Sequence, residues 1–362
     1  MKLLLLSNLI SYTYNFRKEI IEAFHAQGHQ VVVVCDNDDE AKRQELSQIC
    51  RIINVAFDGK GTNPAQELKL LKTYSRILKQ EKPDLVFTFT IKMNLYGGLV
   101  AKHQRIPYVP MITGLGELEK AGKLRALLMF LHKRVMPHAK CVIFQNADNK
   151  AFFDAHNIRY KKAEIVPGSG INLDKFTLQP YPQDGPIVFA FLGRLIPAKG
   201  IEEFLKCAED LAGSSGGKQL TFKAAGKLDD QFRPTVEELV KEGKLTYEGE
   251  LSDTREFLKT SSVLVLPTYH PEGLSNVILE ACATGRPVIC TARTGCKEII
   301  EDGVNGLYCK AKDAENLKEV LQAFSKLPVE KRIQMGQNGR KIVEQKFDRN
   351  LVVQKYLSLL EV

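Results

Sequence analysis

Residues 264–291 read LVLPTYHPEGLSNVILEACATGRPVICT, and this stretch changes from the pattern of a strand to that of a helix and back. An apolar run ends at Pro267, a loop covers residues 270–274, and Ser275 is a suitable N-cap for a helix that stops at Gly285. A second apolar strand follows. A strand, a helix and a strand at this spacing predict a right-handed βαβ unit in a parallel sheet.

The same alternation extends over the first half of the chain. Apolar runs typical of strands covered on both faces predict strands at Lys2–Leu6, Gln30–Cys35, Leu85–Thr90, Tyr108–Thr113, Cys141–Gln145 and Ala163–Val166. Stretches with helical periodicity predict helices at Asn15–Gln27, Pro64–Glu81, Asn94–His103, Ala121–Met136 and Asp148–His156. This order predicts a doubly wound parallel sheet.

A polar, proline-rich stretch, TLQPYPQDG at Thr177–Gly185, is predicted to be an interdomain linker. Beyond it we expect strands at Ile187–Leu192, Leu220–Ala225, Leu245–Tyr247, Val263–Pro267, Val288–Thr291 and Gly306–Tyr308. Helices are expected at Ile201–Leu211, Pro234–Lys241, Thr254–Thr260, Asn276–Thr284, Ala314–Ser325, Val329–Gln345 and Arg349–Leu360. The chain is therefore predicted to be an α/β protein with tandem domains at residues 1–176 and 186–346. Parallel sheets bind ligands at the carboxyl ends of their strands, so two facing sheets would form a cleft for the chemistry.

Composition narrows the class of protein. Hydrophobic residues make up 44% and charged residues 26% of the 362, which excludes disordered and fibrous classes. The opening MKLLLL is too short for a membrane span or a secretory segment, so we expect a soluble chain. Eight scattered cysteines form no CxxC pair, which favours reduced thiols in a cytoplasmic protein.

The net charge of +8 lies in the first half, where residues 1–180 carry 26 Lys and Arg against 17 Asp and Glu. A basic half indicates an anionic partner, which could be nucleic acid, a phosphate-bearing substrate or a membrane surface. Ordinary solvated charge is the alternative. The sequence contains no helix-turn-helix, RNP or KH signal, so we do not expect nucleic-acid binding.

The helix predicted after Ser275 marks a candidate anion site, because free N–H groups and the helix dipole point toward a ligand there. Glu272 stands at the mouth of this site and Glu280 lies one turn inside the helix. An inner carboxylate can accept hydrogen bonds from two neighbouring hydroxyls, as a ribose offers. The alternative is a solvated Glu280, but its neighbours are apolar, and an unpaired buried carboxylate would be costly.

A second candidate segment is FAFLGRLIPAKG at Phe189–Gly200, a buried strand followed by Gly193, Arg194 and Lys199. Two cations at one strand–loop–helix junction suit a diphosphate leaving group. The sequence contains neither GxGxxG nor GxxxxGK[ST], which argues against dinucleotide and P-loop chemistry.

These motifs resemble a known family. GRL-x(3)-KG at 193–200, EG-x(6)-E at 272–280, DGVNG at 302–306 and PGSGINLDKF at 167–176 are similar to the retaining glycosyltransferases of family 4. The resemblance covers essentially the whole chain. It implies the GT-B architecture of two facing Rossmann-like domains, with a C-terminal helix, at about residues 347–362, that crosses back onto the first.

The resemblance also assigns roles in binding a nucleoside-diphosphate sugar. Arg194 and Lys199 would hold the diphosphate as it leaves, Glu272 would contact the donor sugar and Glu280 the ribose. The start of the helix would present backbone N–H groups to the phosphate and the sugar. Gly193 would let the backbone approach the ligand closely, and the nucleotide base would lie near residues 247–249. The donor-binding set is therefore Gly193, Tyr247, Gly249, Gly273, Leu274, Ser275, Asn276 and Glu280. Family members usually need neither a metal nor another cofactor, since cations and a helix terminus can replace magnesium electrostatically.

The acceptor side departs from the common pattern of the family. Where many members carry a histidine, this chain has TGLGE, with Thr113, Gly114 and Glu117. This version resembles bacterial transferases that act on undecaprenyl-diphosphate-linked sugars or capsular precursors, and it favours UDP and a hexose or N-acetylhexosamine. Asn15 and Arg17, after the first strand, are further acceptor-side candidates. Alternatively, Asn15 is a helix cap and Arg17 is solvated.

The segment Lys120–Lys140 combines basic residues with a run of apolar ones. A basic amphipathic helix suits a peripheral enzyme on the inner face of the plasma membrane, and an ordinary core helix is the alternative. His132 and His138 in this segment are predicted to lie at the surface, and His270 in the cleft.

The sequence leaves other functions open. A sugar-nucleotide epimerase or a phosphorylase would share the fold, and a nucleotide-sugar sensor would bind the donor without turnover. The lead hypothesis is transfer of a sugar from a UDP-sugar to a lipid-linked or polysaccharide precursor.

Overall fold

The computed structural model describes residues 1–56, 63–118, 122–215, 218–269 and 273–361. The chain forms two compact units, which are Met1–Ser169 with Asn350–Val362, and Gly170–Arg349. No helix in the described ranges is both long enough and apolar enough to cross a bilayer.

The first unit is built on a parallel sheet of order β3-β2-β1-β4-β5-β6-β7. Its strands are β1 (Lys2–Leu9), β2 (Gln30–Asp36), β3 (Arg51–Asn54), β4 (Leu85–Phe89), β5 (Tyr108–Ile112), β6 (Val142–Phe144) and β7 (Ala163–Ile165). The helices are α1 (Ile10–Ala26), α2 (Glu40–Leu46), α3 (Pro64–Glu81), α4 (Gly98–His103), α5 (Lys123–Val135), α6 (Ala147–Ala155) and α13 (Arg349–Ser358). A π-helical turn, Met93–Gly97, leads into α4.

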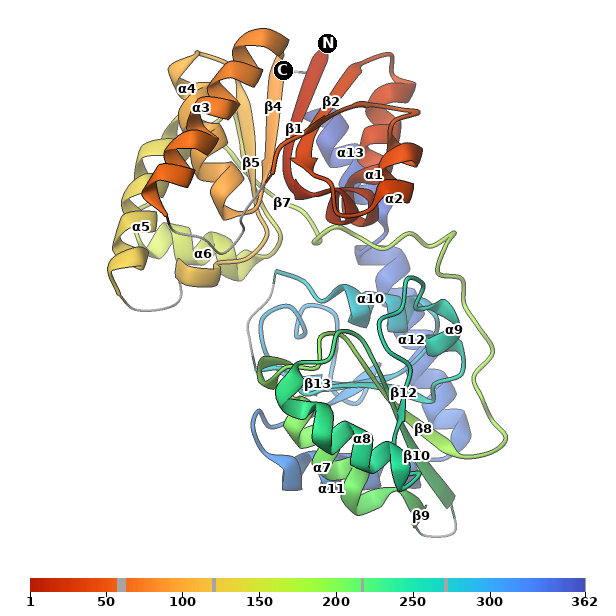
Figure 1. Ribbon diagram of the computed structural model, residues 1–362. Coiled ribbons are helices and arrows are strands. Elements are labelled where there is room, and N and C mark those ends of the chain that lie inside the picture. The colour runs from red at the N-terminus through yellow and green to blue at the C-terminus, as the bar shows by residue number, and fades with distance from the viewer. Residues whose placement is uncertain (57–62, 119–121, 216–217, 270–272, 362) are drawn as a thin grey trace. The chain divides into compact units, whose positions relative to one another are not determined.

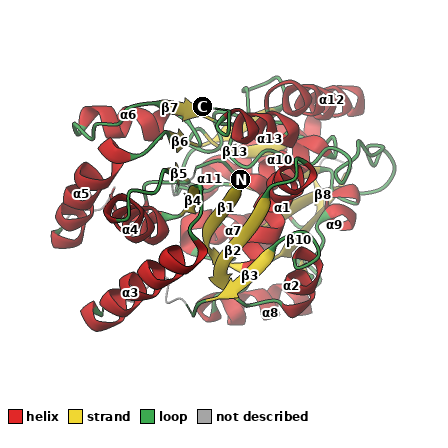
Figure 2. Ribbon diagram, turned by 90° about the horizontal axis from the view of Figure 1, so that it is seen from above, coloured by secondary structure: helices red, strands yellow, loops and turns green. Residues whose placement is uncertain are grey.

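Successive side chains of the strands pack into two different cores. Leu3 and Leu5 of β1 face the core formed with α1 and α13. Leu4 and Leu6 face the core formed with α3, α4 and α5. This alternation is the normal consequence of a strand covered on both sides, and Figures 1 and 2 show the two helix layers.

The second unit repeats the doubly wound plan with strand order β11-β10-β8-β12-β13-β14, all parallel, while the short β9 pairs antiparallel with β10. Its strands are β8 (Ile187–Leu192), β9 (Gly213–Ser215), β10 (Lys218–Ala225), β11 (Thr246–Tyr247), β12 (Val263–Leu266), β13 (Val288–Thr291) and β14 (Gly306–Cys309). The helices are α7 (Ile201–Leu211), α8 (Arg233–Lys241), α9 (Arg255–Lys259), α10 (Asn276–Ala283), α11 (Ala314–Lys326) and α12 (Val329–Lys346).

Both sheets contain a topological switch point, where the strand order reverses. In the first unit it lies between β1 and β4, and in the second between β8 and β12. The connections that leave two such strands diverge to opposite faces, which opens a crevice at the carboxyl edge of the sheet. The predicted fold class is confirmed, and both candidate segments follow the strands beside the second switch point.

The C-terminal helix α13 returns to the first unit, as predicted. Its Tyr356 ring packs against Phe87 with centroids 5.4 Å apart, and Lys355 forms a 2.7 Å ion pair with Glu164. The boundary between the units falls at residues 169/170, ahead of the stretch 177–185 that was predicted as the linker. That stretch is tied into the second unit, where Nη2 of Arg286 donates to the carbonyl of Pro180 at 2.6 Å.

The first helix begins earlier than the sequence indicated. It starts at Ile10, so Asn15 lies within α1 and is not its cap. The reason is a remote carboxylate, because Asp38 accepts the backbone N–H of Ser11 at 2.9 Å and also its hydroxyl. This carboxylate satisfies a donor of the first turn that no neighbouring residue caps.

His132 also differs from the prediction. It was predicted to lie at the surface, but it is buried on the inner face of α5, where its Nδ1 lies 2.7 Å from the carbonyl of Leu128. Burial lowers the pKa of His132 to about 4, so its imidazole is neutral. His138 is exposed, in agreement with the prediction, and His270 lies outside the described residues.

Candidate active site

Glycines follow three neighbouring strands of the second unit, and they contact one another at the carboxyl ends of these strands. Gly193 follows β8, Gly226 follows β10 and Gly249 lies two residues beyond β11. A Cβ on Gly226, whose φ is +129°, would lie 1.9 Å from the carbonyl oxygen of Gly193, so this contact requires glycine. The N–H of Gly226 donates to the carbonyl of Gly249 at 2.7 Å, and the Tyr247 hydroxyl donates to the carbonyl of Gly226 at 2.8 Å. Three predicted donor residues, Gly193, Tyr247 and Gly249, therefore lie together at the carboxyl edge.

The two loops beside the switch point are joined to each other. The carbonyl of Ala198, in the loop after β8, accepts the N–H of Tyr269 at 3.1 Å and the hydroxyl of Thr268 at 3.0 Å, both from the loop after β12. Gly200 packs so closely on Pro267 that a Cβ would lie 2.3 Å from its carbonyl oxygen. The loop that carries Arg194 and Lys199 is thus fixed against the loop that leads to α10.

The two predicted cations lie in this first loop. Arg194 is exposed, and Lys199 is half-buried at the end of the 3-10 turn Pro197–Lys199. Two positive side chains on one short connection at a switch point suit an anion with more than one charge. Glu272, the third residue predicted to take part in the reaction, lies outside the described residues.

Helix α10 begins at Asn276, with Ser275 as its N-cap. The Ser275 hydroxyl oxygen is buried and has no hydrogen-bond partner within the described chain, and it does not cap its own helix. The Ser275 N–H donates to the carbonyl of Gly295 at 3.0 Å, which fixes the helix start beside the loop after β13. Gly273 and Leu274 are also buried here. This helix start, with an unused hydroxyl donor, is suited to bind an anionic oxygen.

Glu280 lies one turn inside α10. Its Oε2 accepts a 2.7 Å hydrogen bond from the hydroxyl of Thr254, which immediately precedes α9. Burial raises the pKa of Glu280 to about 7, although the Thr254 hydrogen bond and the charges of Lys175 and Arg349 act in the opposite direction. Glu280 is therefore held in place and partly protonated near neutral pH. Sequence reasoning missed Thr254, because it lies 26 residues from Glu280 and carries no motif of its own.

A cavity of about 400 Å³ lies near α9, lined by Lys175, Phe176, Thr177, Gln179, Asp253, Arg255, Glu256, Lys259 and Thr284. None of the predicted donor residues lines it. Glu280 lies beside it, because its partner Thr254 stands between the lining residues Asp253 and Arg255, whereas Gly193, Tyr247 and Gly249 lie at the carboxyl edge of the sheet.

The acceptor candidates of the first unit lie on three segments. Asn15 is exposed on α1, while Thr113 and Gly114 follow β5 and are half-buried. Glu117 is in the 3-10 turn Gly116–Leu118, and its side chain is outside what the structure describes.

Arg17 is buried, with only 5% of its surface exposed, so the alternative that its side chain is solvated is wrong. Its guanidinium lies 4.6 Å from the centre of the Phe89 ring and donates to Ser169 Oγ at 2.9 Å and to Met111 Sδ at 3.2 Å. Its position at the ends of β4 and β5 places it on the carboxyl edge of the first sheet.

Two family models match the chain. The model described as Glycosyl transferase 4-like matches residues 2–146, and the model described as Glycosyl transferases group 1 matches residues 176–342. Together they cover every donor-binding segment described above and all strands of the two sheets except β7, which lies between the two matched ranges.

Characterised relatives extend over both units. The chain is 28% identical to the N,N'-diacetylbacillosaminyl-diphospho-undecaprenol alpha-1,3-N-acetylgalactosaminyltransferase of Campylobacter jejuni, over 100% of this chain and 98% of that protein. It is 23% identical to the UDP-Gal:alpha-D-GlcNAc-diphosphoundecaprenol alpha-1,3-galactosyltransferase of Escherichia coli, over 78% and 75% of the two chains.

The fold is also similar to that of solved structures. HepE from Anabaena, in complex with UDP and glucose, superposes with a TM-score of 0.79 over 100% of this chain and 99% of that one, at 19% identity. WaaG, a glycosyltransferase involved in lipopolysaccharide biosynthesis, superposes with a TM-score of 0.75 over 99% of both chains, at 17% identity. At these identities the likeness shows the GT-B fold.

Proposed function

We propose, from the premise that this chain is a glycosyltransferase that belongs to the group 1 family, that it moves a hexose or an N-acetylhexosamine from a UDP-sugar to a lipid-linked saccharide with retention of configuration. The observation that carries the proposal is the pair of hydrogen bonds from Thr268 and Tyr269 to Ala198. These bonds fix the cationic loop against the loop after β12 at the switch point, and that second loop leads to the start of α10, which would also bind the diphosphate.

The donor would lie along the carboxyl edge of the second sheet. Arg194 and Lys199 would bind the diphosphate, the Ser275 hydroxyl and the start of α10 would donate to its oxygens, and Glu280 would accept from the ribose. Tyr247 and Gly249 would border the base. Glu272 would contact the donor sugar, as the resemblance implies. HepE in its complex with UDP and glucose has the same fold, which supports a nucleotide sugar as the donor.

In the reaction, the bond between the anomeric carbon and the diphosphate oxygen breaks, and a bond from that carbon to the acceptor oxygen forms on the same face. The acceptor hydroxyl proton passes to the departing phosphate oxygen. Arg194, Lys199 and the helix start would stabilise the negative charge on the leaving group. The reaction proposed in this way needs neither a metal ion nor a protein nucleophile. The acceptor-side candidates Asn15, Arg17, Thr113, Gly114 and Glu117 would orient the incoming hydroxyl.

The acceptor is proposed to be an undecaprenyl-diphosphate-linked saccharide or a similar polysaccharide precursor. The support is the full-length similarity to the Campylobacter jejuni enzyme, whose name states such an acceptor. An acceptor of this kind is held in a membrane, so we place the protein at the inner face of the plasma membrane as a peripheral enzyme.

Helix α5 supplies the surface for this contact. Leu124, Leu127 and Phe130 are 39%, 54% and 53% exposed, whereas His132 and Val135 face the core. Exposed cations flank the apolar residues, and the Arg134 guanidinium lies 5.1 Å from the centre of the Phe130 ring. An exposed apolar stripe beside basic residues suits an anionic lipid surface better than a wholly buried core helix.

The test is transfer of a labelled sugar. Purified protein would be incubated with UDP-, GDP- and ADP-sugars and with an undecaprenyl-diphosphate-linked saccharide, and the lipid product would be analysed by mass spectrometry. We expect product with a UDP-sugar only, and an α-linked sugar by NMR. Conversion of the UDP-sugar without an acceptor would instead indicate an epimerase, and binding of the UDP-sugar without turnover across acceptors would indicate a sensor.

A further inference from the structure

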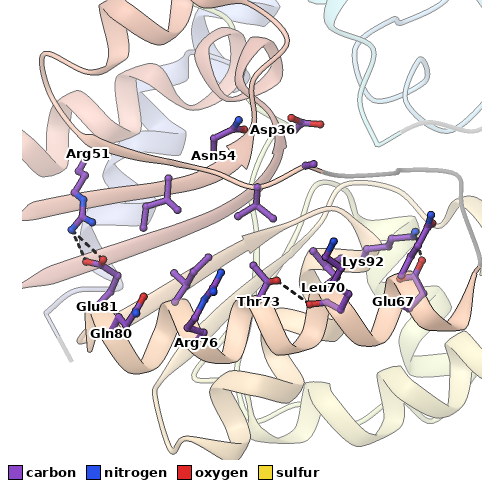
Figure 3. A pocket seen from close by; sticks show the side chains of 16 residues that line it. Asp36, Arg51, Asn54, Glu67, Leu70, Thr73, Arg76, Gln80, Glu81 and Lys92 are labelled. Atoms are coloured by element: carbon purple, nitrogen blue, oxygen red, sulfur yellow. Dashed lines mark hydrogen bonds and ion pairs between the residues drawn. The ribbon is translucent and has the colours of Figure 1, made fainter.

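A groove runs along the edge of the first sheet, between the edge strand β3 and helix α3, as Figure 3 shows. Its volume is about 710 Å³. At one end it reaches Asn54, the last residue of β3, and Lys92, which follows β4. At the other end lie Arg51, the first residue of β3, and Glu81, the last of α3. A ligand that fills the groove therefore has one end at the carboxyl edge of the sheet, where parallel sheets bind their substrates.

The middle of the groove is apolar. Ile53 and Val55 from the sheet side and Leu70 from α3 are half-buried, and Ile77 is buried. None of the residues that line the groove is aromatic, so it offers no stacking surface for a nucleobase. The lining suits an aliphatic chain better than a nucleotide or nucleic acid.

Two carboxylates in the groove are already neutralised. Glu81 forms ion pairs of 2.7 Å with Lys2 and 3.1 Å with Arg51, and Glu67 forms one of 2.7 Å with Lys92. Asp36, at the carboxyl end, accepts the N–H of Asn37 at 2.9 Å. Of the three acids that line the groove, the two on α3 are therefore paired with cations, while Asp36 lies at the carboxyl end.

Two cations on α3 remain available. Lys69 and Arg76 are exposed and line the groove two helical turns apart, and neither side chain makes a hydrogen bond or ion pair with the described residues. The groove therefore combines an apolar floor with a positive wall, which is the complement of an anionic amphiphile.

We infer that this groove binds the isoprenoid diphosphate part of the lipid-linked acceptor. The diphosphate lies against Lys69 and Arg76, the first isoprene units lie on Ile53, Leu70 and Ile77, and the saccharide reaches the carboxyl edge. This inference rests on the proposed function and adds a lipid site that lies outside the Asn15, Arg17 and Thr113–Glu117 set. It makes chain-bearing acceptors better substrates than soluble saccharides with the same sugars.

The experiment measures binding of a fluorescent short-chain isoprenyl diphosphate to the 362-residue chain, without membranes. The double variant Lys69→Gln/Arg76→Gln is compared with wild type and with the matched control Lys72→Gln/Lys79→Gln. Lys72 and Lys79 are exposed on the same helix but do not line the groove. We expect Kd to rise roughly tenfold or more in the first variant, because charge-assisted hydrogen bonds are lost, and to change less than about twofold in the control.

A second variant, Thr73→Trp, tests the groove by filling it from the middle of α3, and circular dichroism reports whether it folds. It should lose isoprenyl diphosphate binding and keep UDP binding. Equal losses in both double variants would mean that general charge attraction alone holds the ligand, and unchanged binding in Lys69→Gln/Arg76→Gln would overturn the inference.

UDP binding to the same proteins separates this inference from the proposed function. One outcome is that UDP binds all variants equally while isoprenyl diphosphate binding is not weakened specifically in the groove variants. In that case the groove assignment fails and the donor site stands. If UDP fails to bind wild type, the proposed function fails independently of the lipid result.

Discussion

The Thr254 hydroxyl donates a 2.7 Å hydrogen bond to Oε2 of Glu280, which links the start of α9 to the inside of α10. This bond orients the carboxylate that we assign to the ribose. It also counteracts the effect of burial, which raises the pKa of Glu280 to about 7. The Glu280 carboxyl group in the proposed donor site therefore changes its protonation state near physiological pH.

The first prediction is that UDP binding depends on pH through Glu280. Two ribose hydroxyls need an acceptor, so the ionised carboxylate is the binding form, and affinity should fall as pH decreases below about 7. Calorimetry in buffers of different ionisation enthalpy should show proton release on binding at pH 6. The Glu280→Gln variant should bind several-fold more weakly at pH 8 and lose this pH dependence. A wild-type affinity that stays flat from pH 5.5 to 8 contradicts the assignment.

The second prediction concerns Thr254→Val. Because the lost hydrogen bond lowered the pKa of Glu280, that pKa should rise further, and the midpoint of the pH dependence of UDP binding should move upward. Thr246→Val, an exposed change on β11, is the control and should leave the midpoint in place. If both variants titrate like wild type, Thr254 does not tune the carboxylate.

Glu280 also makes stability depend on pH. Its pKa in the folded chain lies above the unfolded value of 4.5, so the stabilisation is complete below pH 4.5 and is lost as pH rises through about 7. The difference in the free energy of unfolding between wild type and Glu280→Gln should change in this window, with the variant relatively more stable at pH 8. Urea titrations at pH 5 and pH 8 would measure it, and equal differences at both values would contradict the raised pKa.

The fourth prediction uses two glycines that both have a positive φ. Gly226→Ala should destabilise the second unit by more than ~2 kcal/mol and abolish UDP binding, because the new Cβ would meet the Gly193 carbonyl at 1.9 Å. A Cβ on Gly213, whose φ is +113°, would meet nothing within 4 Å, so Gly213→Ala should cost only the backbone strain of about 1 kcal/mol. Similar losses in both variants would show that strain, and not the Gly193 contact, is decisive.

The fifth prediction is that α5 docks on anionic membranes. Leu127→Glu/Phe130→Glu should lose flotation with vesicles of phosphatidylcholine and phosphatidylglycerol, and wild type should not bind pure phosphatidylcholine. The control is Val240→Glu on α8, where an apolar side chain is 43% exposed in the other unit. Retained flotation of the α5 variant would assign the membrane contact to another surface.

Much of the fold could be predicted from sequence, because its strands are apolar and its helices periodic. The predicted bounds of the helix Pro64–Glu81 and of the strand Ile187–Leu192 agree with α3 and β8. Strand β3 was missed because its four residues, RIIN, have polar ends and lie at the sheet edge. Helix α2 was missed too, since it is short and contains few apolar residues.

The site residues could be predicted only where neighbouring positions in the sequence form a recognisable motif. Arg194, Lys199 and Ser275 lie at strand–loop–helix junctions, and that pattern alone places them at the carboxyl edge. The pairing of Thr254 with Glu280, and the Asp38 carboxylate that starts α1, depend on residues that only the folded chain brings together. His132 was misplaced because a polar residue on an amphipathic helix was assigned to the surface, although the Leu128 carbonyl satisfies it inside.

The central claim is that the loop after β8 and the start of α10 form one site for a nucleoside diphosphate. Calorimetric titration of UDP into wild type, Arg194→Ala/Lys199→Ala and the exposed α7 control Lys206→Ala tests it most directly. We predict micromolar binding to wild type and to the control, and at least a roughly hundredfold weaker Kd for the double variant, since two charge-assisted contacts to phosphate are lost. Wild-type affinity in the double variant would contradict the claim.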